Sequence, residues 1–383
     1  MAGSEVVVLG GGFGGAAAAL AARRLLPTEH RVTLIDRSPV AHLCGANPLI
    51  VVDQRPASGV SRSTEVFAAK GIEVMFAEIT AIDVEAREVA TDRGGRRFDH
   101  LVVALGAVYD PEAVPGSADA HSFYHHDGAL RLRERLAGLE AGTIAVVVAR
   151  APIKCPPAPI ETILLIEDWA RRRGIRHLVG LHLAIPEPVP LGVAGPEASG
   201  RISGMLGDRG IALHTGAVLA EVGDHGTEAR FADGSSITAD VLAVVPVHRV
   251  PAVVEASGLT GGKPWVPVEA STLETAVPGV FAIGDVNGIP IGPNTGVPKA
   301  GAFASGEGAT VGAVIASRIL GSEPPPRYDG HGSCFLAVSA AESATVGGTF
   351  LAPDGPEVGM GPVTTETMAA MVRWEQDWQA FDI

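Results

Sequence analysis

The chain has little of several residue types that mark other classes of protein. Among its 383 residues there are only three cysteines, and aromatic residues make up 5%. A secreted, disulfide-rich scaffold would carry many more cysteines, and the C-x-x-C spacing typical of zinc sites is absent. The few aromatic residues, with alanine and valine filling much of the rest, fit α/β layers with close helix–strand contacts.

Positive charge is also scarce. The chain carries 29 basic and 43 acidic residues, a formal net charge of −14. This charge argues against binding of nucleic acid and against anionic membrane surfaces. It is compatible with a cationic protein partner, although acidity alone is mostly a solubility trait.

Long apolar runs are missing too. No uninterrupted run reaches the roughly 18 residues of a transmembrane helix, so no transmembrane segment is expected. A strand begins by Glu5 and leaves no room for a signal peptide. The sequence as written therefore predicts a cytoplasmic location, or a periplasmic one if an export leader was removed.

The histidines show no metal-ligand spacing, so no metal site is expected. His125 and His126 are interpreted as polar surface residues. Nothing in the sequence supports a Ser-His-Asp triad.

A dinucleotide fingerprint opens the chain. Gly10, Gly12 and Gly15 form G-x-G-x-x-G between an apolar strand and an alanine-rich helix that runs to about Leu26. The first glycine permits the tight turn, the second lets a pyrophosphate approach, and the third packs helix on strand. Asp36 ends the next strand and is placed to bind a ribose hydroxyl. This arrangement predicts a dinucleotide site.

Two further segments indicate that the dinucleotide is FAD. The stretch Phe98 to Pro111 is predicted to be a buried strand that ends in Gly106, where the chain leaves the first domain. The stretch Pro278 to Asn287 is predicted to be a strand that ends in Gly284 and Asp285. An aspartate there can hydrogen-bond the ribityl chain, with the N-terminus of the next helix aimed at the flavin.

The order of these segments predicts an α/β protein with two Rossmann-like domains of the glutathione-reductase type, the second inserted in the first. The FAD domain is expected to comprise residues 1–110 and 247–321, and the inserted domain residues 111–246. Residues 322–383 are expected to form a small α+β domain with hairpin strands and a C-terminal helix. That helix carries apolar residues at near-helical spacing and is expected to pack on the protein; the alternative is a membrane-dipping surface. These residues are Met368, Met371, Val372, Trp378 and Phe381.

The most unusual stretch is Val148 to Glu161, "VARAPIKCPPAPIE", which follows an apolar strand. In a two-domain flavoprotein, a glycine-rich turn for a second dinucleotide belongs here. This turn has four prolines and no glycine, and prolines supply neither close backbone approach nor N–H donors. We therefore expect that this site does not bind a nicotinamide cofactor and instead holds Cys155 rigidly.

Taken together, these motifs resemble the sulfide-oxidising branch of the two-dinucleotide-domain flavoproteins. That branch comprises sulfide:quinone oxidoreductases and the flavoprotein subunit of flavocytochrome c sulfide dehydrogenase. The resemblance covers essentially the whole chain and rests on the FAD fingerprint and on the stretches "KCPPAP", "AIGDVN", "NTGVPKAGAFASGEGA" and "SCFLA".

The resemblance implies that Cys155 and Cys334 form a redox-active disulfide above one face of the flavin. Hydrosulfide would attack one sulfur and leave a persulfide on one cysteine and a thiolate on the other. Cys334 is expected to face the flavin and Cys155 to carry the persulfide. The flavin, the helix N-terminus after Pro159 and Lys154 are expected to lower the pKa of the leaving thiol.

Three features are more similar to flavocytochrome c. Cys44 lies where that family has a cysteine joined covalently to the flavin, Glu161 matches an acid near the flavin, and the tail "WEQDWQAFDI" resembles the family's C-terminus. The implied electron acceptor is a c-type cytochrome. A membrane quinone is the first alternative, and a flavin electron-transfer subunit whose thiols do no turnover is the second.

Several roles remain open from the sequence alone. Glu161 either takes a proton from the incoming sulfur species or is a first-turn helix acid stabilised by the helix dipole. Cys44 is either the flavin thioether or a buried free thiol. Lys299, after Pro298 at a helix start, is expected to stabilise negative charge at the flavin N1–C2=O edge, because a lysine is otherwise disfavoured at a helix N-terminus.

Overall fold

The computed structural model describes residues 3–293, 295–322 and 327–380. Its first sheet is entirely parallel and has the strand order β20-β9-β1-β2-β5. The chain leaves this sheet after β9 and returns to it with β20, so the intervening segment is an insertion. The strands are β1 (Glu5–Leu9), β2 (Arg31–Asp36), β5 (Glu73–Phe76), β9 (His100–Val103) and β20 (Val280–Ala282).

Two helices pack closely beside this sheet, α1 (Phe13–Leu25) and α8 (Gly301–Leu320). The inward face of α1 consists of alanines and glycines, which let another backbone come near. A Cβ atom on Gly308 would overlap the carbonyl of Gly14, and one on Gly312 would crowd the carbonyl of Ala18. The contact between the two helices therefore depends on glycine.

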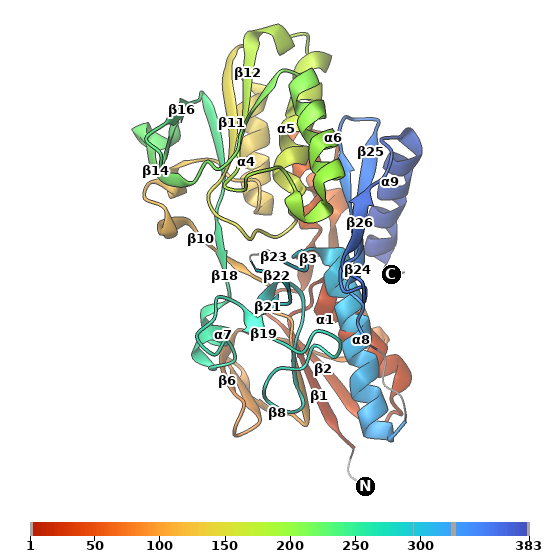
Figure 1. Cartoon of the computed structure of the whole chain (residues 1–383). Helices are drawn as coiled ribbons and strands as arrows, with labels where there is room; N and C mark the ends of the chain where they lie inside the picture. Colours follow the sequence, from red (N-terminus) through yellow and green to blue (C-terminus); the bar gives the residue numbers. More distant parts are fainter. Residues whose placement is uncertain (1–2, 294, 323–326, 381–383) are drawn as a thin grey trace.

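The inserted segment builds a second parallel sheet of order β13-β12-β11-β17, in the upper half of Figure 1. β11 and β17 are buried along most of their length and therefore consist of continuous isoleucine, valine, leucine and alanine runs, whereas Gly180 and His182 interrupt β12. The strands are β11 (Gly142–Val148), β12 (Val179–Ala184), β13 (Ile211–His214) and β17 (Val241–Val245). Three helices belong to this half, α4 (His126–Ala137), α5 (Ala158–Arg172) and α6 (Pro196–Asp208).

The two halves are joined by an antiparallel ribbon of β10 (Val108–Asp110) and β18 (Val247–Arg249), in which Tyr109 lies opposite His248. Two small antiparallel sheets decorate the halves: β6 (Ile79–Asp83), β7 (Glu88–Thr91) and β8 (Gly94–Arg97), and β14 (Leu219–Gly223), β15 (Glu228–Phe231) and β16 (Ser236–Thr238). The other short elements are β3 (Val40–His42), β4 (Ser61–Ser63), β19 (Val266–Pro267), β21 (Asn287–Gly288), β22 (Pro290–Gly292), β23 (Thr295–Gly296), α2 (Asn47–Val51), α3 (Val66–Ala69) and α7 (Ala252–Ala256).

The last part of the chain forms an antiparallel sheet of β24 (His331–Ala337), β25 (Ser343–Thr349) and β26 (Glu357–Met360), followed by α9 (Thr365–Ala380). Figure 1 shows this unit, in blue, alongside both halves of the molecule. Met368, Met371 and Trp378 are buried, which confirms that α9 packs on the protein. Phe381 lies outside the described residues.

These elements confirm the α/β fold with two Rossmann-like sheets that the sequence predicts. The exact domain boundaries stay a prediction. Within the described ranges, no helix combines the length and the apolar character that a membrane crossing needs.

Candidate functional site

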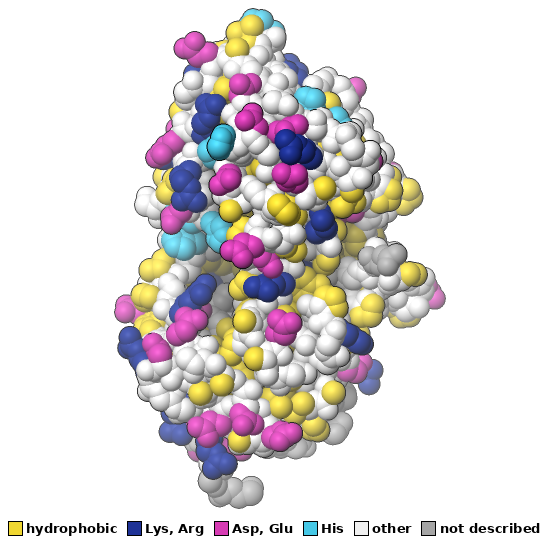
Figure 2. All heavy atoms as spheres, turned by 90° about the vertical axis from the view of Figure 1, so that its left-hand side faces the viewer, with side chains coloured by type: hydrophobic (Ala, Val, Ile, Leu, Met, Phe, Trp, Pro, Cys, Tyr) yellow, Lys and Arg dark blue, Asp and Glu magenta, His cyan; other side chains and the backbone are white. Residues whose placement is uncertain are grey.

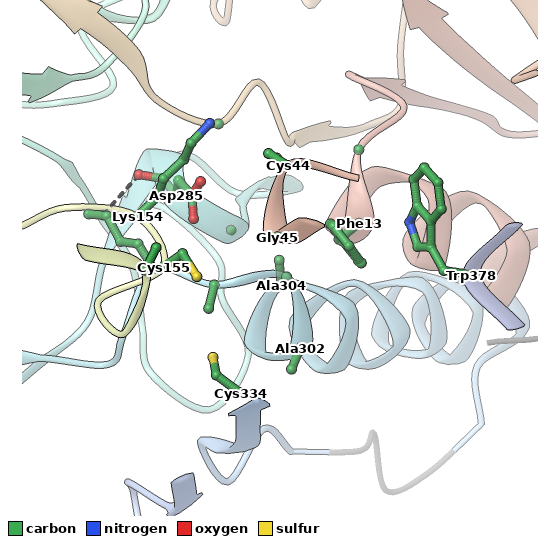
Figure 3. Close-up of a pocket in the computed structure, with 18 of the residues that line it drawn as sticks. Phe13, Cys44, Gly45, Lys154, Cys155, Asp285, Ala302, Ala304, Cys334 and Trp378 are labelled. Carbon is green, nitrogen blue, oxygen red and sulfur yellow. Dashed lines mark hydrogen bonds between the residues drawn. The ribbon is translucent and has the colours of Figure 1, made fainter. Parts of the chain in front are cut away.

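A cavity of about 450 Å³ lies where the three parts of the chain meet. The half built on the first sheet contributes the turn Gly11–Gly14 and Asp285, which follows β20. The inserted half contributes Lys154 and Cys155, and the C-terminal unit contributes Cys334. Figure 3 shows these groups around one space, and Figure 2 shows the molecular surface hollowed between the halves, with histidine side chains at the edge of the hollow.

The fingerprint glycines form a cradle that only glycine permits. Gly10 has a φ of 95°, and a Cβ atom there would crowd the Ala104 carbonyl. A Cβ atom on Gly15 would overlap the carbonyl of Gly10, whereas the space at Gly12 is open. The first turn of α1 therefore presents backbone N–H groups to the cavity, which is the arrangement that binds a pyrophosphate.

Asp36 closes β2 beside this cradle. Its carboxylate accepts hydrogen bonds from the N–H of Gly11 at 2.5 Å and from the N–H of Ser38 at 2.9 Å. Gly106 lines the cavity with open space where a Cβ would stand and with a φ of 67°. Both positions fit the expected dinucleotide.

The turn at Gly284 and Asp285 forms another wall of the cavity. Burial raises the pKa of Asp285, and the nearby ammonium groups of Lys154 and Lys299 oppose that rise. A carboxyl at this place can bind the hydroxyls of a ribityl chain, as the sequence predicts.

A second acid, Glu307 of α8, binds this turn through hydrogen bonds. The sequence analysis did not identify it. It accepts hydrogen bonds from the N–H of Gly284 at 2.5 Å and from the side-chain amide of Asn287 at 2.8 Å. Burial raises its pKa to about 8. The only sequence signal was a charged residue in the middle of an otherwise alanine- and glycine-rich helix.

The proline-rich turn holds Cys155 through its own backbone. Cys155 has a φ of 49°, a left-handed conformation that is uncommon for a residue with a side chain. Its N–H donates to the carbonyl of Lys299 at 2.6 Å, and its carbonyl accepts from the N–H of Ala158 at 2.8 Å. The Tyr124 hydroxyl donates to the carbonyl of Lys154 at 3.1 Å. The Cys155 N–H is thus already occupied, which fits the expected loss of a second pyrophosphate site.

The structure brings Cys155 and Cys334 together across the cavity. Their sulfur atoms point toward one another in Figure 3, and both are free thiols. Burial raises the pKa of both thiols, and each carries a further rise from the nearby acid Glu161. Among the groups expected to lower the pKa of the leaving thiol, the N–H of Ala158 at the start of α5 does so at Cys155, but burial outweighs it. Lys154 interacts mainly with Cys44, Tyr109 and Asp285.

Glu161 lies in the first turn of α5 and is almost fully buried. It accepts one hydrogen bond, from the N–H of Ala337 in β24 at 3.0 Å. Burial raises its pKa to about 8, so the carboxyl is protonated at neutral pH. A buried carboxyl that lines the same cavity as the two thiols is suited to proton exchange.

Lys299 has its ammonium bound within the protein. Nζ donates to the carbonyls of Asp285 at 2.8 Å and Asn287 at 2.6 Å, and it lies 3.6 Å from the centre of the Trp265 ring. Burial lowers its pKa to about 8. Pro298, the residue before it, lines a small neighbouring pit rather than the main cavity.

Cys44 begins a short 3-10 turn, Cys44–Ala46, at the rim of the cavity, and it is exposed. This position leaves the thiol free to meet a bound cofactor. The sequence alternative of a buried free thiol is wrong, because Cys44 is not buried. A covalent bond to the flavin stays a prediction.

The remaining wall is aromatic and comes from α1 and α9. The Phe13 ring stacks on Trp374 at 5.9 Å between ring centres and lies 6.0 Å from Trp378. Arg62 stacks over Trp378 at 4.2 Å and donates to its carbonyl. The sequence pattern predicted the buried side of α9 but not that it lines the site.

His125 is exposed, and His126 is half-buried, with its ring stacked on His42 at 4.5 Å between ring centres. Across the described ranges, no cluster of three or more histidine, cysteine or acidic side chains is arranged to hold a metal ion.

The cavity fits FAD. The glycine cradle suits a pyrophosphate, Asp36 a ribose, Asp285 a ribityl chain, and the part of the cavity lined by Cys155 and Cys334 a flat ring. The family comparison agrees. The sequence profile of the pyridine nucleotide-disulphide oxidoreductases matches residues 4–308.

Individual relatives are more distant. The chain is 26% identical over 286 residues to the mitochondrial sulfide:quinone oxidoreductase of Dictyostelium discoideum, a match that covers 71% of this chain and 62% of that protein. It is 25% identical over 254 residues to the Schizosaccharomyces pombe mitochondrial sulfide:quinone oxidoreductase, covering 62% of this chain and 54% of that protein. The chain thus spans under two thirds of these relatives.

The fold is also that of solved structures. The sulfide:quinone oxidoreductase of Aquifex aeolicus superimposes with a TM-score of 0.87 at 22% identity, over 97% of this chain and 90% of that one. Because the family profile matches residues 4–308, most of the chain, the protein belongs to the pyridine nucleotide-disulphide oxidoreductase family.

Proposed function

We propose that this protein oxidises sulfide, or a related sulfur nucleophile, in an FAD-dependent reaction that uses Cys155 and Cys334 as a redox pair. One observation carries the proposal: two thiols from distant parts of the chain face each other in a dinucleotide cavity, next to a buried carboxyl. The similarity to proteins named sulfide:quinone oxidoreductase supports the choice of substrate.

In the working cycle the two thiols alternate with a disulfide. Hydrosulfide attacks one sulfur of the disulfide, a new S–S bond forms to the substrate, and the other cysteine leaves as a thiolate. FAD, when bound, supplies a two-electron acceptor for this chemistry. We assign the persulfide to Cys155 and the flavin-facing thiolate to Cys334.

The surrounding residues position these groups. The hydrogen bond from the Cys155 N–H to the Lys299 carbonyl fixes the backbone that carries this sulfur. We assign proton transfer to Glu161, because its carboxyl lies in the cavity with the two thiols and its raised pKa is close to the pH at which it would work.

We propose a quinone as the electron acceptor. The relatives' names include a quinone, and the wall formed by Phe13, Trp374 and Trp378 is suited to a flat apolar ring. A c-type cytochrome is the second candidate. The exposed rim position of Cys44 favours it, because a covalently tethered flavin is the feature that resembles flavocytochrome c.

The first test is anaerobic addition of sulfide to the FAD-loaded protein, followed by absorbance near 450 nm. Bleaching is expected in the wild type and its loss in Cys155→Ser. No bleaching in the wild type would leave only a non-turnover electron-transfer role, and rapid bleaching by NADH would favour a nicotinamide-dependent reductase.

The second test separates the acceptors. Turnover with a short-chain quinone but not with soluble cytochrome c is expected; the reverse result would select the cytochrome. The mass of the denatured protein settles Cys44, since a gain of one FAD requires the thioether.

A further inference from the structure

Two of the four lysines in the chain line the dinucleotide cavity, Lys154 and Lys299. The sequence pointed to Lys299 as the cation beside the flavin. The structure places the two ammonium groups in different surroundings, and this difference suggests another assignment.

The ammonium of Lys299 is already bound. Two backbone carbonyls accept its hydrogen bonds, at 2.8 and 2.6 Å, and the Trp265 ring covers it at 3.6 Å. The ammonium therefore ties Lys299 to the Asp285 turn, while the Lys299 backbone carbonyl accepts a hydrogen bond from the Cys155 N–H at 2.6 Å. Lys299 therefore acts as a brace between the two halves of the site.

Lys154 is different. Its ammonium lies 4.6 Å from the centre of the Tyr109 ring, on the side of the cavity that faces Cys44 and Asp285. In the part of the chain that the structure describes, it forms no ion pair with a carboxylate at salt-bridge distance. Burial lowers the pKa of Lys154, but its neighbours, among them Asp285, outweigh burial and raise it. Its ammonium lines the cavity without a direct ion pair to a described carboxylate and is therefore available to a negative charge on a bound ring.

We propose that Lys154, rather than Lys299, is the cation that stabilises the negative charge of the reduced flavin. Two-electron reduction with uptake of one proton leaves one negative charge on the ring (FAD + 2e⁻ + H⁺ → FADH⁻). With sulfide as donor the balance closes (HS⁻ → S⁰ + H⁺ + 2e⁻). A fixed positive charge at the ring stabilises the reduced form over the neutral oxidised form and raises the midpoint potential.

The inference rests on the FAD binding of the proposed function, not on sulfide as the donor. The test is therefore the midpoint potential of the FAD-loaded protein, measured by reduction with dithionite against a reference dye. A failure of sulfide to reduce the protein would leave this measurement intact.

Lys154→Met is expected to lower the midpoint potential by at least about 30 mV, a tenfold change in the two-electron equilibrium constant. Lys154→Arg keeps the charge and is expected to restore most of the potential. Lys154→Gln, which retains a donor beside Tyr109, is the second neutral variant if the methionine variant does not fold, and it is expected to lower the potential as well.

Two controls separate charge from structure. Lys70→Met removes an exposed lysine that does not line the cavity and is expected to leave the potential unchanged. Lys299→Met is expected to lower the melting temperature more than the potential. Equal potentials for wild type and the neutral Lys154 variants, or a larger shift in Lys299→Met than in Lys154→Met, would overturn the assignment.

Discussion

At the scale of single residues, one variant of Glu161 can distinguish its two possible roles, proton acceptor and first-turn helix acid. The base form of this buried carboxyl increases as the pH rises through about 8. If it accepts a proton from the sulfur species, Glu161→Gln is expected to slow sulfide-dependent flavin reduction by about 10²- to 10⁴-fold and to remove the dependence on pH near 8. Stopped-flow reduction between pH 6 and 9 measures both.

The alternative role, a first-turn acid stabilised by the helix dipole, makes a different prediction for the same variant. The melting temperature would fall slightly, and only above about pH 8, where the carboxyl is ionised, since such a charge contributes about 0.3 to 1 kcal/mol. The rate and its pH profile would then match those of the wild type, and the proton-transfer role would be excluded.

Site residues that a backbone turn requires could be predicted from the sequence. Site residues whose role depends on where a long side chain ends in the folded protein could not. Gly10, Gly12 and Gly15 follow from the turn that they permit, and Cys155 follows from a turn without glycine. The ammonium positions of Lys154 and Lys299 depend on how long side chains pack between domains, which no local pattern encodes. Glu307 acts on the Gly284 turn only through the tertiary fold.

At the scale of elements, two glycines of α8, Gly308 and Gly306, provide a test variant and a matched control. Gly308→Ala is expected to destabilise the protein by at least about 1 kcal/mol, despite the higher helix propensity of alanine, because the added methyl overlaps the Gly14 backbone. Thermal or urea unfolding measures the change.

Gly306, two residues earlier on the same helix, is the control. A Cβ atom there would make ordinary contacts, with the edge of the Tyr328 ring at 3.4 Å and with the His331 carbonyl at 3.7 Å. Gly306→Ala is therefore expected to be neutral or to stabilise by up to about 1 kcal/mol. Equal destabilisation by both variants would contradict the close contact of α1 and α8.

The helix α9 makes a second prediction at this scale. Trp378 is 2% exposed and packs against Phe13 and Arg62. Trp378→Ala is expected to cost about 3 to 5 kcal/mol of the free energy of unfolding. Gln376→Ala changes an exposed position of the same helix and is expected to stay within about 0.5 kcal/mol of the wild type. A small effect of Trp378→Ala would mean that α9 is not held by this ring.

Long elements were easier to predict than most short ones. The strands β1, β11 and β17 are largely continuous apolar runs, and α1, α5 and α8 are long and bounded by clear signals. The three-stranded sheets β6–β8 and β14–β16 are partly exposed, with strands of three to five residues, too short for a periodic pattern to stand out. The ribbon of β10 and β18 forms only when segments about 140 residues apart meet.

At the scale of the whole molecule, two buried acids make stability depend on pH. Burial raises the pKa of Glu161 and of Glu307 from 4.5 to about 8. Between these values the unfolded chain has lost both protons while the folded protein keeps them. The free energy of unfolding is therefore expected to fall as the pH rises from about 5 to 8.

The variant Glu161→Gln/Glu307→Gln tests this contribution. Neutral amides remove the two titrations, so the difference in unfolding free energy between pH 5 and pH 8 is expected to shrink by an amount on the order of a few kcal/mol. Urea unfolding at the two pH values measures it. An unchanged difference would mean that neither acid retains its proton in the folded state.

The order of the parts along the chain has a consequence for synthesis. Cys334 lies in β24, after both Rossmann-like sheets are complete. While the protein is still emerging from the ribosome, Cys155 already stands in its loop, but its partner sulfur has not yet been made. The proposed thiol couple therefore assembles as one of the last events of translation, and a chain released before Cys334 would lack both the couple and the α9 wall of the cavity.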